Sequence, residues 1–255
     1  MNRVKKIHDS FIQHEPFLDD IITNFDTKGE DFGNQDRNAL KLFKLDAKTL
    51  NVKSFRVPNF INQIAYRFIR KSKAERSFVY AKKLQALSIG TPQPIAFYEY
   101  KNLLLFKKSY YISEQLECDL TYRELTTDLN YPNHERILRA FTRFTYQLHQ
   151  NNINFLDHSP GNTLIKQSAN GYDFFLVDLN RMEFVPMDFE TRIKNFAKLT
   201  IHKSMIEIMS DEYAKCCDQP FETVFHLMWK HTEAFQEKYR RKKRLKKKLK
   251  FWKKR

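Results

Sequence analysis

The stretch LDHSPGNTLI (156–165), followed closely by FFLVDL (174–179), decides the fold of this chain. Asp157 and Asn162 lie five residues apart in a segment that contains Pro and Gly, and Asp178 comes at the end of an apolar run. A carboxylate can orient an acceptor hydroxyl and accept its proton, and Asp and Asn oxygens can hold Mg²⁺ against nucleotide phosphates. The three side chains predict a phosphoryl-transfer site, provided that the chain brings them together.

The segments around this stretch have clear periodicities. Residues 134–150 (HERILRAFTRFTYQLHQ) place apolar side chains on one helical face, which predicts an amphipathic helix. NTLI (162–165) and YDFFLVDL (172–179) read as short strands on either side of an Asn170–Gly171 turn. From Arg192 onward the pattern is helical.

The N-terminal half predicts four strands and a helical region. NALKLFKL (38–45) and LNVKSFRV (50–57) alternate apolar and polar residues, as a hairpin does, with the core side chains Leu50, Val52 and Phe55 or Val57. A helical region follows over 60–87, interrupted near Ser72, and two further strands flank a turn at Lys101–Asn102. Residues 1–37 are mixed and polar, so the expected order is strand, strand, helix, strand, strand.

This order, followed by a helix, the Asp157-x4-Asn162 loop, a hairpin and Val177-Asp178, resembles the protein-kinase fold. LNVKSFRVPN, RKSKAERSF, GTPQPIAFYEY, LDHSPGNTLI and LVDLNRMEF together resemble the Kdo/WaaP lipopolysaccharide kinase family over roughly residues 35–200. The resemblance implies an α+β, bilobal, protein-kinase-like fold. We expect a small β-rich N-lobe at 1–116 and a helical C-lobe at 117–255, with ATP in the cleft between them.

The resemblance also implies roles for individual residues. Asp157 matches the catalytic base, whereas Asn162 and Asp178 match the Mg²⁺ ligands. Lys53 matches the strand lysine that contacts the ATP phosphates, and Glu75 is its candidate partner, although Ser77 or Val79 could occupy that register. Residues near Glu114–Glu117 should form the hinge that binds adenine. The implied acceptor is a sugar hydroxyl of the lipopolysaccharide inner core, on Kdo or else heptose.

Three departures from the protein-kinase pattern argue against regulation through an activation loop. Phe155-Leu156 precedes Asp157 in place of His-Arg, and Leu-Asn-Arg follows Asp178 in place of Phe-Gly. No regular Gly-rich loop precedes Leu40, although Gly29 and Gly33 lie there. The missing loop leaves a catalytically inactive, kinase-like scaffold open as an alternative.

The positive charge is concentrated at one end. Residues 238–255 contain 13 Lys or Arg and no acid, so that the rest of a chain of net charge +15 carries only +2. Leu245, Leu249 and Trp252 share one helical face among these cations, as in a helix that lies on an anionic membrane surface. The alternative is a solvated tail or a nucleic-acid-binding segment, although no stacking motif or recognition helix is visible.

The remaining features suggest the cytoplasm. The N-terminus lacks the apolar run of a signal peptide, and Cys118, Cys216 and Cys217 have neither metal-site nor disulfide spacing. Together with the tail and the lipid-linked acceptor, this predicts a cytoplasmic protein, peripheral on the inner face of the inner membrane.

Simpler interpretations compete with several assignments. Lys53 could be a solvated lysine, Glu75 an ordinary surface charge, and the Asp and Asn side chains turn formers. His149 is expected to pack near the catalytic loop, and His158 is a less favoured candidate for a proton shuttle.

Overall fold

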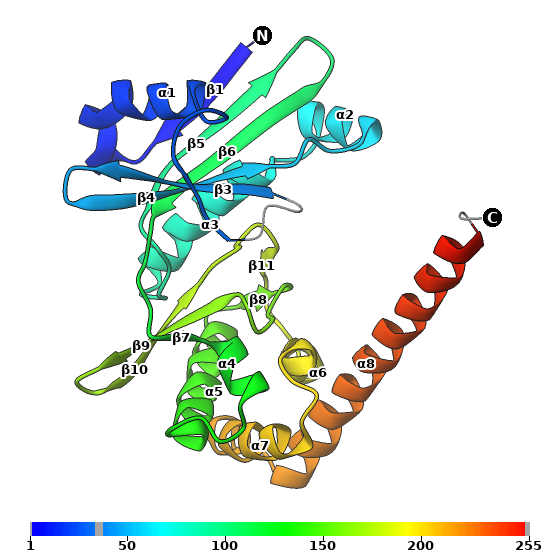
Figure 1. The fold of residues 1–255 in the computed structure, drawn as a ribbon. Coiled ribbons are helices and arrows are strands. Elements are labelled where there is room, and N and C mark those ends of the chain that lie inside the picture. The colour runs from blue at the N-terminus through cyan, green and yellow to red at the C-terminus, as the bar shows by residue number, and fades with distance from the viewer. Residues whose placement is uncertain (1, 34–37, 253–255) are drawn as a thin grey trace. The chain divides into compact units, whose positions relative to one another are not determined.

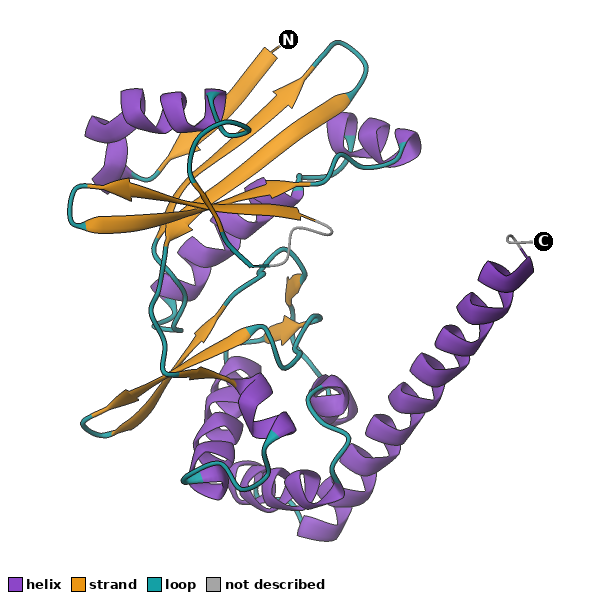
Figure 2. Ribbon diagram, in the orientation of Figure 1, coloured by secondary structure: helices purple, strands orange, loops and turns teal. Residues whose placement is uncertain are grey.

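The computed structural model describes residues 2–33 and 38–252, with side chains up to residue 247 (Figure 1). The chain forms two compact units. The first contains Met1–Glu117 and Leu176–Arg181, and the second contains Cys118–Phe175 and Met182–Arg255. Figure 2 shows that the first is built around a sheet and the second is mostly helical. Leu176–Arg181 was expected in the C-lobe, but its contacts assign it to the first unit.

A six-stranded antiparallel sheet forms the centre of the first unit. Its strand order is β1–β5–β6–β4–β3–β2, with the bounds Asn2–Ile7 (β1), Pro94–Lys101 (β5), Phe106–Glu114 (β6), Lys48–Phe55 (β4), Asn38–Leu45 (β3) and Glu30–Asp31 (β2). The two predicted hairpins, β3–β4 and β5–β6, are both present. Asp46 adopts a positive φ of 52° in the β3–β4 turn, a conformation that Asp tolerates better than most residues.

The side-chain alternation of β4 divides its residues between two cores. Leu50 and Val52 are buried in a cluster with residues of the N-terminal helix, whereas Phe55 is buried on the other side with Phe78 and Phe97. Val57, the alternative to Phe55, lies beyond the strand and is 42% exposed. Lys53 shares the alternation phase of Phe55, and its Nζ lies 5.4 Å from the centre of that ring.

The helical region over 60–87 is interrupted as predicted. Helix α2 (Phe60–Phe68) and helix α3 (Lys73–Ala86) are separated by a short break, where the Ser72 side chain caps α3 by accepting a hydrogen bond from the Glu75 amide at 3.1 Å. Helix α3 packs on the sheet through Ala74 and Phe78.

The expectation that residues 1–37 contain no element before the first hairpin is wrong. Strand β1 pairs with β5, and a 3₁₀-helix (η1, Asp9–His14) and helix α1 (Glu15–Thr23) follow it. The strand is largely exposed at the sheet edge, so its sequence has no burial pattern; its pairing depends on backbone hydrogen bonds to β5. The helix buries Leu18, Ile21 and Ile22, whose spacing is visible in the sequence.

Helices form most of the second unit. Helix α5 (His134–Gln150) packs against α7 (Lys203–Cys217), which packs against α8 (Phe221–Trp252). The shorter elements are α4 (Tyr122–Thr127), α6 (Phe189–Lys194), the 3₁₀-helix η2 (Asn195–Lys198), the strands β7 (Leu120–Thr121), β9 (Thr163–Ser168) and β10 (Gly171–Leu176), and the pair β8 (Ile153–Phe155) and β11 (Met182–Phe184). The predicted α5 helix and the β9–β10 hairpin are confirmed. No helix in the described part of the chain has the length and hydropathy that a bilayer-spanning segment requires.

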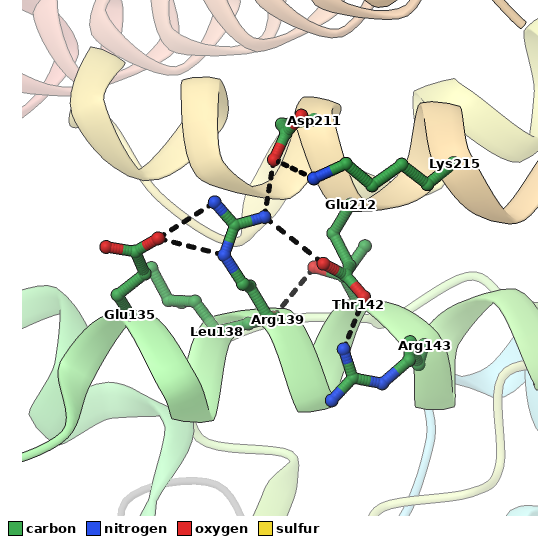
Figure 3. A network of polar contacts seen from close by, with 8 residues as sticks. All are labelled: Glu135, Leu138, Arg139, Thr142, Arg143, Asp211, Glu212 and Lys215. Carbon is green, nitrogen blue, oxygen red and sulfur yellow. Dashed lines mark hydrogen bonds and ion pairs between the residues drawn. The ribbon is translucent and has the colours of Figure 1, made fainter.

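A charged network joins α5 to α7 (Figure 3). Arg139 reaches Asp211 at 2.5 Å and Glu212 at 3.1 Å, and Arg143 donates to the other oxygen of Glu212. Lys215 also pairs with Asp211, at 2.7 Å. These carboxylates raise the pKa of Arg139. Charge-assisted hydrogen bonds of this kind are directional, so the network helps to fix the register of the two helices.

Candidate active site

Lys53 and Asp178 meet in the first unit. Lys53 Nζ lies 2.8 Å from Asp178 Oδ1, and both side chains are partly buried. The lysine projects from β4, whose backbone is paired on both sides, with β3 and with β6. A central strand therefore holds the ammonium group in place, as a phosphate-positioning lysine requires.

The backbone before Asp178 is tied to the first unit. The Leu176 amide donates to the Gly90 carbonyl at 2.9 Å, and the Thr91 hydroxyl donates to the Leu176 carbonyl at 2.9 Å. Two residues later Asp178 adopts a positive φ of 58°, which is unusual for a residue with a side chain. The Asn180 side-chain nitrogen Nδ2 donates to Asp178 Oδ1 at 2.6 Å. These contacts hold the carboxylate in a backbone conformation of the kind that clusters at functional sites.

Asp157 and Asn162 meet in the second unit. Asn162 Nδ2 donates to the Asp157 carbonyl at 2.8 Å, and its backbone amide donates to the Ser159 carbonyl at 2.9 Å. Because the amide nitrogen is engaged by the loop backbone, Asn162 Oδ1 is the atom of this group suited to bind a cation. Both loop residues are thus in one compact turn, as the five-residue spacing predicts.

A polar cluster of Asn195, His149 and His158 packs against the loop that contains Asp157 and Asn162. Asn195, at the start of η2, donates to the Phe155 carbonyl at 3.0 Å and lies 3.0 Å from His158 Nδ1. His149 lies 3.4 Å from the same Asn195 oxygen and 2.8 Å from the Tyr213 hydroxyl. Burial lowers the pKa of His158 to about 4 and that of His149 to about 3. Both rings are neutral at pH 7, and their contacts favour a structural role over a proton shuttle for His158.

Lys198 is a residue of this site that the sequence did not reveal. Its Nζ lies 3.9 Å from Asp157 Oδ1 and donates to the Leu156 carbonyl. It is 41 positions from Asp157 in the sequence and belongs to no local motif. Only the packing of η2 against the loop brings this cation to the candidate base.

Arg123 is a second cation near the loop. A Cβ atom placed on Gly161 would lie 2.6 Å from Arg123 Nη2, so the guanidinium of this α4 residue packs directly against the loop backbone. Glycine at 161 allows this close approach.

Glu75 has a different partner from the one expected. Its carboxylate pairs with Lys71 at 3.3 Å, while the ion pair described for Lys53 is with Asp178. The alternatives in the same helix do not supply a carboxylate: Ser77 is buried, and Val79 packs against the cluster around Phe78. The pairing of Glu75 with Lys53 remains a prediction, and in this conformation Asp178 takes its place.

The segment Glu114–Glu117 continues from β6. The Glu114 amide donates to the Gln93 carbonyl at 2.9 Å, and the Gln115 amide donates to the Thr49 carbonyl at 2.8 Å. Since these two amides are already engaged, a backbone donor to adenine from this segment would have to come from Leu116 or Glu117.

The donor types suit Mg²⁺ when nucleotide phosphates complete the coordination. Asp178 offers carboxylate oxygens and Asn162 an amide oxygen, the hard ligands that Mg²⁺ prefers. No cluster of three or more His, Cys, Asp or Glu side chains that could hold a metal occurs among the described residues.

Comparisons with known proteins agree with this description. The family model described as "Lipopolysaccharide kinase (Kdo/WaaP) family" matches residues 43–217. A solved structure titled "WaaP in complex with acyl carrier protein" is similar to this chain with a TM-score of 0.64 and 15% identity, over 94% of this chain and 99% of that one. At this identity the likeness establishes the fold, and the predicted α+β, kinase-like class is confirmed. No curated protein sequence matches the chain.

Proposed function

Because the chain belongs to the lipopolysaccharide kinase (Kdo/WaaP) family, we propose that it transfers the γ-phosphoryl group of ATP to a sugar hydroxyl of the lipopolysaccharide inner core. The proposed acceptor sugar is Kdo, with heptose as the alternative. The observation that carries the proposal is the 2.8 Å contact between Lys53 and Asp178, because it unites two of the four matched residues over a long sequence separation.

In the proposed reaction, Asp157 accepts a hydrogen bond from the acceptor hydroxyl and takes its proton as the oxygen attacks the γ-phosphorus. The new bond joins the sugar oxygen to phosphorus, the bond to the bridging oxygen of ADP breaks, and ADP leaves with that electron pair. Lys53 positions the nucleotide phosphates. Lys198, which lies beside Asp157, is a further cation that could stabilise the charge of the transferred group.

Asn162 and Asp178 are the proposed holders of Mg²⁺. The bound ion would neutralise charge on the β- and γ-phosphates. The hydrogen bond from Asn180 and the ion pair with Lys53 keep the Asp178 carboxylate oriented before the nucleotide enters. Glu75 is retained as a candidate partner of Lys53 in the nucleotide-bound state, where Asp178 would turn to the metal.

The acceptor is amphiphilic, so we propose that the protein works on the cytoplasmic face of the inner membrane. Helix α8 continues into the basic segment, and all described side chains from Lys238 to Lys247 are exposed. Leu245 is among these exposed residues, whereas the side chains of Leu249 and Trp252 lie outside the described residues. Eight cations among these ten residues support an electrostatic contact with anionic lipid.

The direct test is incubation of the full chain with labelled ATP and Mg²⁺, with Kdo–lipid A and a heptosylated acceptor in parallel reactions. Mass spectrometry of the lipid should show one added phosphate on the Kdo acceptor, and the fragment ions would locate the hydroxyl. Phosphate on the heptosylated acceptor alone would transfer the assignment to heptose. No phosphate on either, from a folded protein, would contradict the proposal.

A kinase-like scaffold is the second candidate. It is favoured by the sequence before Leu40, which has no regular Gly-rich loop; Gly29 there has a packing role, because a Cβ atom on it would lie 2.5 Å from the Phe43 ring. The following residues 34–37 are outside the described part of the chain. Calorimetry with Mg²⁺·ATP separates the two candidates, since a scaffold without nucleotide binding would produce no binding heat.

A further inference from the structure

Helix α2 presents its apolar side chains outward. No residue of the helix is buried, and Phe60, Ile61, Phe68 and the adjoining Ile69 are 61% to 81% exposed. A helix that packs on a core normally buries its apolar face. The orientation of α2 is the reverse, which leaves a ridge of aromatic and aliphatic groups without a partner in the described chain.

The contacts that attach α2 to its unit explain this orientation. The Tyr66 ring packs on Phe106 of β6 with 5.7 Å between ring centres, and Arg67 Nε donates to the Asn102 carbonyl at 3.1 Å. Figure 1 shows the helix beside β6. The side of α2 that faces the sheet is therefore the polar and tyrosine-bearing side.

The β5–β6 turn, to which Arg67 bonds, carries two more exposed apolar side chains. Asn102 Oδ1 accepts hydrogen bonds from the amides of Leu104 at 3.1 Å and Leu105 at 2.6 Å, which fixes the turn. Within it Leu103 is 82% exposed and Leu104 is 65% exposed. Because Arg67 bonds to this turn, the helix and the turn are held together. We define the α2 patch as Phe60, Ile61, Phe68, Ile69, Leu103 and Leu104.

The residues around the α2 patch carry an excess of positive charge. Residues 56–76 contain one acid, Glu75, which pairs with Lys71 at 3.3 Å, and six cations: Arg56, Arg67, Arg70, Lys71, Lys73 and Arg76. Two of the guanidinium groups lie over aromatic rings, Arg67 at 5.1 Å from Phe68 and Arg70 at 5.9 Å from Tyr66. Such stacking keeps the cations beside the apolar groups.

We infer that the α2 patch inserts into an anionic lipid surface, with its cationic border on the headgroups. Exposed Phe, Ile and Leu bordered by Lys and Arg are the composition of helices that lie in a bilayer interface. A second copy of the chain is the poorer occupant, because it would bring together two segments, each residues 56–76, that both carry a net charge of +5. Anionic lipid satisfies both the apolar ridge and the charge.

This inference deepens the proposed function and rests on it. The contact would place the first unit on the kind of surface that carries the proposed acceptor. It is independent of the basic tail, which lies in the other unit. The two contacts differ in chemistry, since the α2 patch adds apolar insertion to electrostatic attraction.

The test is co-sedimentation of the full chain with vesicles of phosphatidylcholine containing 30 mol% phosphatidylglycerol, with about 0.15 M salt to screen long-range attraction. The double variant Ile61→Ser/Ile69→Ser should lower the partition coefficient at least about tenfold, because two side chains lose their burial in lipid. The matched control Ile12→Ser/Ile201→Ser alters residues that are 55% and 60% exposed outside the patch, and it should bind as the wild type does.

A second measurement reports insertion directly. Ile61→Trp, in a chain with Trp229→Phe and Trp252→Phe, should shift its emission to the blue and be quenched by brominated lipid. Ile201→Trp in the same background should do neither. Wild-type vesicle binding by the Ile61→Ser/Ile69→Ser chain, or absence of quenching at position 61, would overturn the inference. Either result is also what we expect if the patch binds a protein partner in place of lipid.

Kinase activity on a detergent-dispersed acceptor separates this inference from the proposed function. The Ile61→Ser/Ile69→Ser chain should phosphorylate that acceptor at the wild-type rate while losing vesicle binding. An inactive wild type that still inserts would contradict the proposed function and leave the membrane contact established.

Discussion

Lys53 Nζ and Asp178 Oδ1 are 2.8 Å apart although 125 residues separate them in the chain. The pairing is possible because the backbone of Leu176, at the end of β10, hydrogen-bonds to Gly90 and Thr91. A residue following a hairpin is thereby fixed opposite a lysine of the central sheet. The contact joins the proposed phosphate-positioning lysine to the proposed metal ligand, and it is the basis of the first prediction.

Replacement of Lys53 with Met should lower kcat/KM for ATP about 100-fold or more, because an electrostatic contact to the transferring phosphates is lost. Stability should change by less than about 1 kcal/mol, since the ion pair is only partly buried. Steady-state kinetics with urea unfolding measures both effects. Lys108→Met is the matched control: Lys108 lies on the neighbouring strand β6 and pairs with Asp26 at 3.3 Å, so near-wild-type kinetics are expected. Equal losses in both variants would contradict the role of Lys53.

Asp157→Ala should abolish phosphoryl transfer without unfolding the protein, because the loop is held by main-chain hydrogen bonds and by Asn195. Lys198→Met should retain measurable transfer, with a larger effect on kcat than on KM, since this cation neighbours the base without matching any of the family roles. Single-turnover kinetics separates acceptor binding from phosphoryl transfer. A variant at Asp157 with near-wild-type turnover on the true acceptor would defeat the assignment.

The stability of the protein should fall with pH below about 6.5, partly because of His149. Burial lowers its pKa to about 3 in the folded protein, while the unfolded chain takes up the proton near the ordinary value of 6.5. Between these values the unfolded state binds more protons, so that this group lowers the free energy of unfolding by about 1.4 kcal/mol per pH unit as pH falls. Urea unfolding of the wild type and of His149→Gln at pH 7.5 and pH 5 measures the difference in slope. Identical slopes would show that His149 does not titrate on unfolding.

Glu212→Gln should destabilise the second unit by about 1–3 kcal/mol, because Arg139 and Arg143 both lose a charged acceptor that is mostly buried. Asp20→Asn removes an exposed ion pair with Lys28 and should have a clearly smaller effect, because solvent screens this pair. Thermal and urea unfolding of both variants gives the comparison. A similar cost at the two positions would mean that the α5–α7 network contributes no more than surface charge pairs.

Deletion of residues 238–255 should weaken binding to anionic vesicles most strongly at low salt, because a purely electrostatic contact is screened as ionic strength rises. Folding should be unaffected, since the residues of α8 that pack in the unit, Val224, Met228 and Thr232, precede the deletion. Vesicle sedimentation over a salt series gives the result. Unchanged binding would remove the tail from the membrane contact, and a higher affinity for RNA than for anionic lipid would revive nucleic-acid binding.

Local sequence determined the elements and the loop that contains Asp157 and Asn162. Alternation in 38–57, the 3.6-residue period of 134–150 and the Asn170–Gly171 turn are local patterns, and each element formed as predicted because burial of one face requires that periodicity. The five-residue spacing likewise places Asn162 beside the Asp157 carbonyl within one turn.

The tertiary structure decided which distant groups meet. The edge strand β1 has no burial pattern because its stabilisation comes from backbone pairing with β5, and Lys198 reaches Asp157 only through the packing of η2. Glu75 has the right type and approximate position, yet its neighbour Lys71 holds it, and Asp178 takes the partner role for Lys53. Sequence periodicity specifies which face of an element is buried, but the meeting of side chains far apart in the chain depends on how these faces pack.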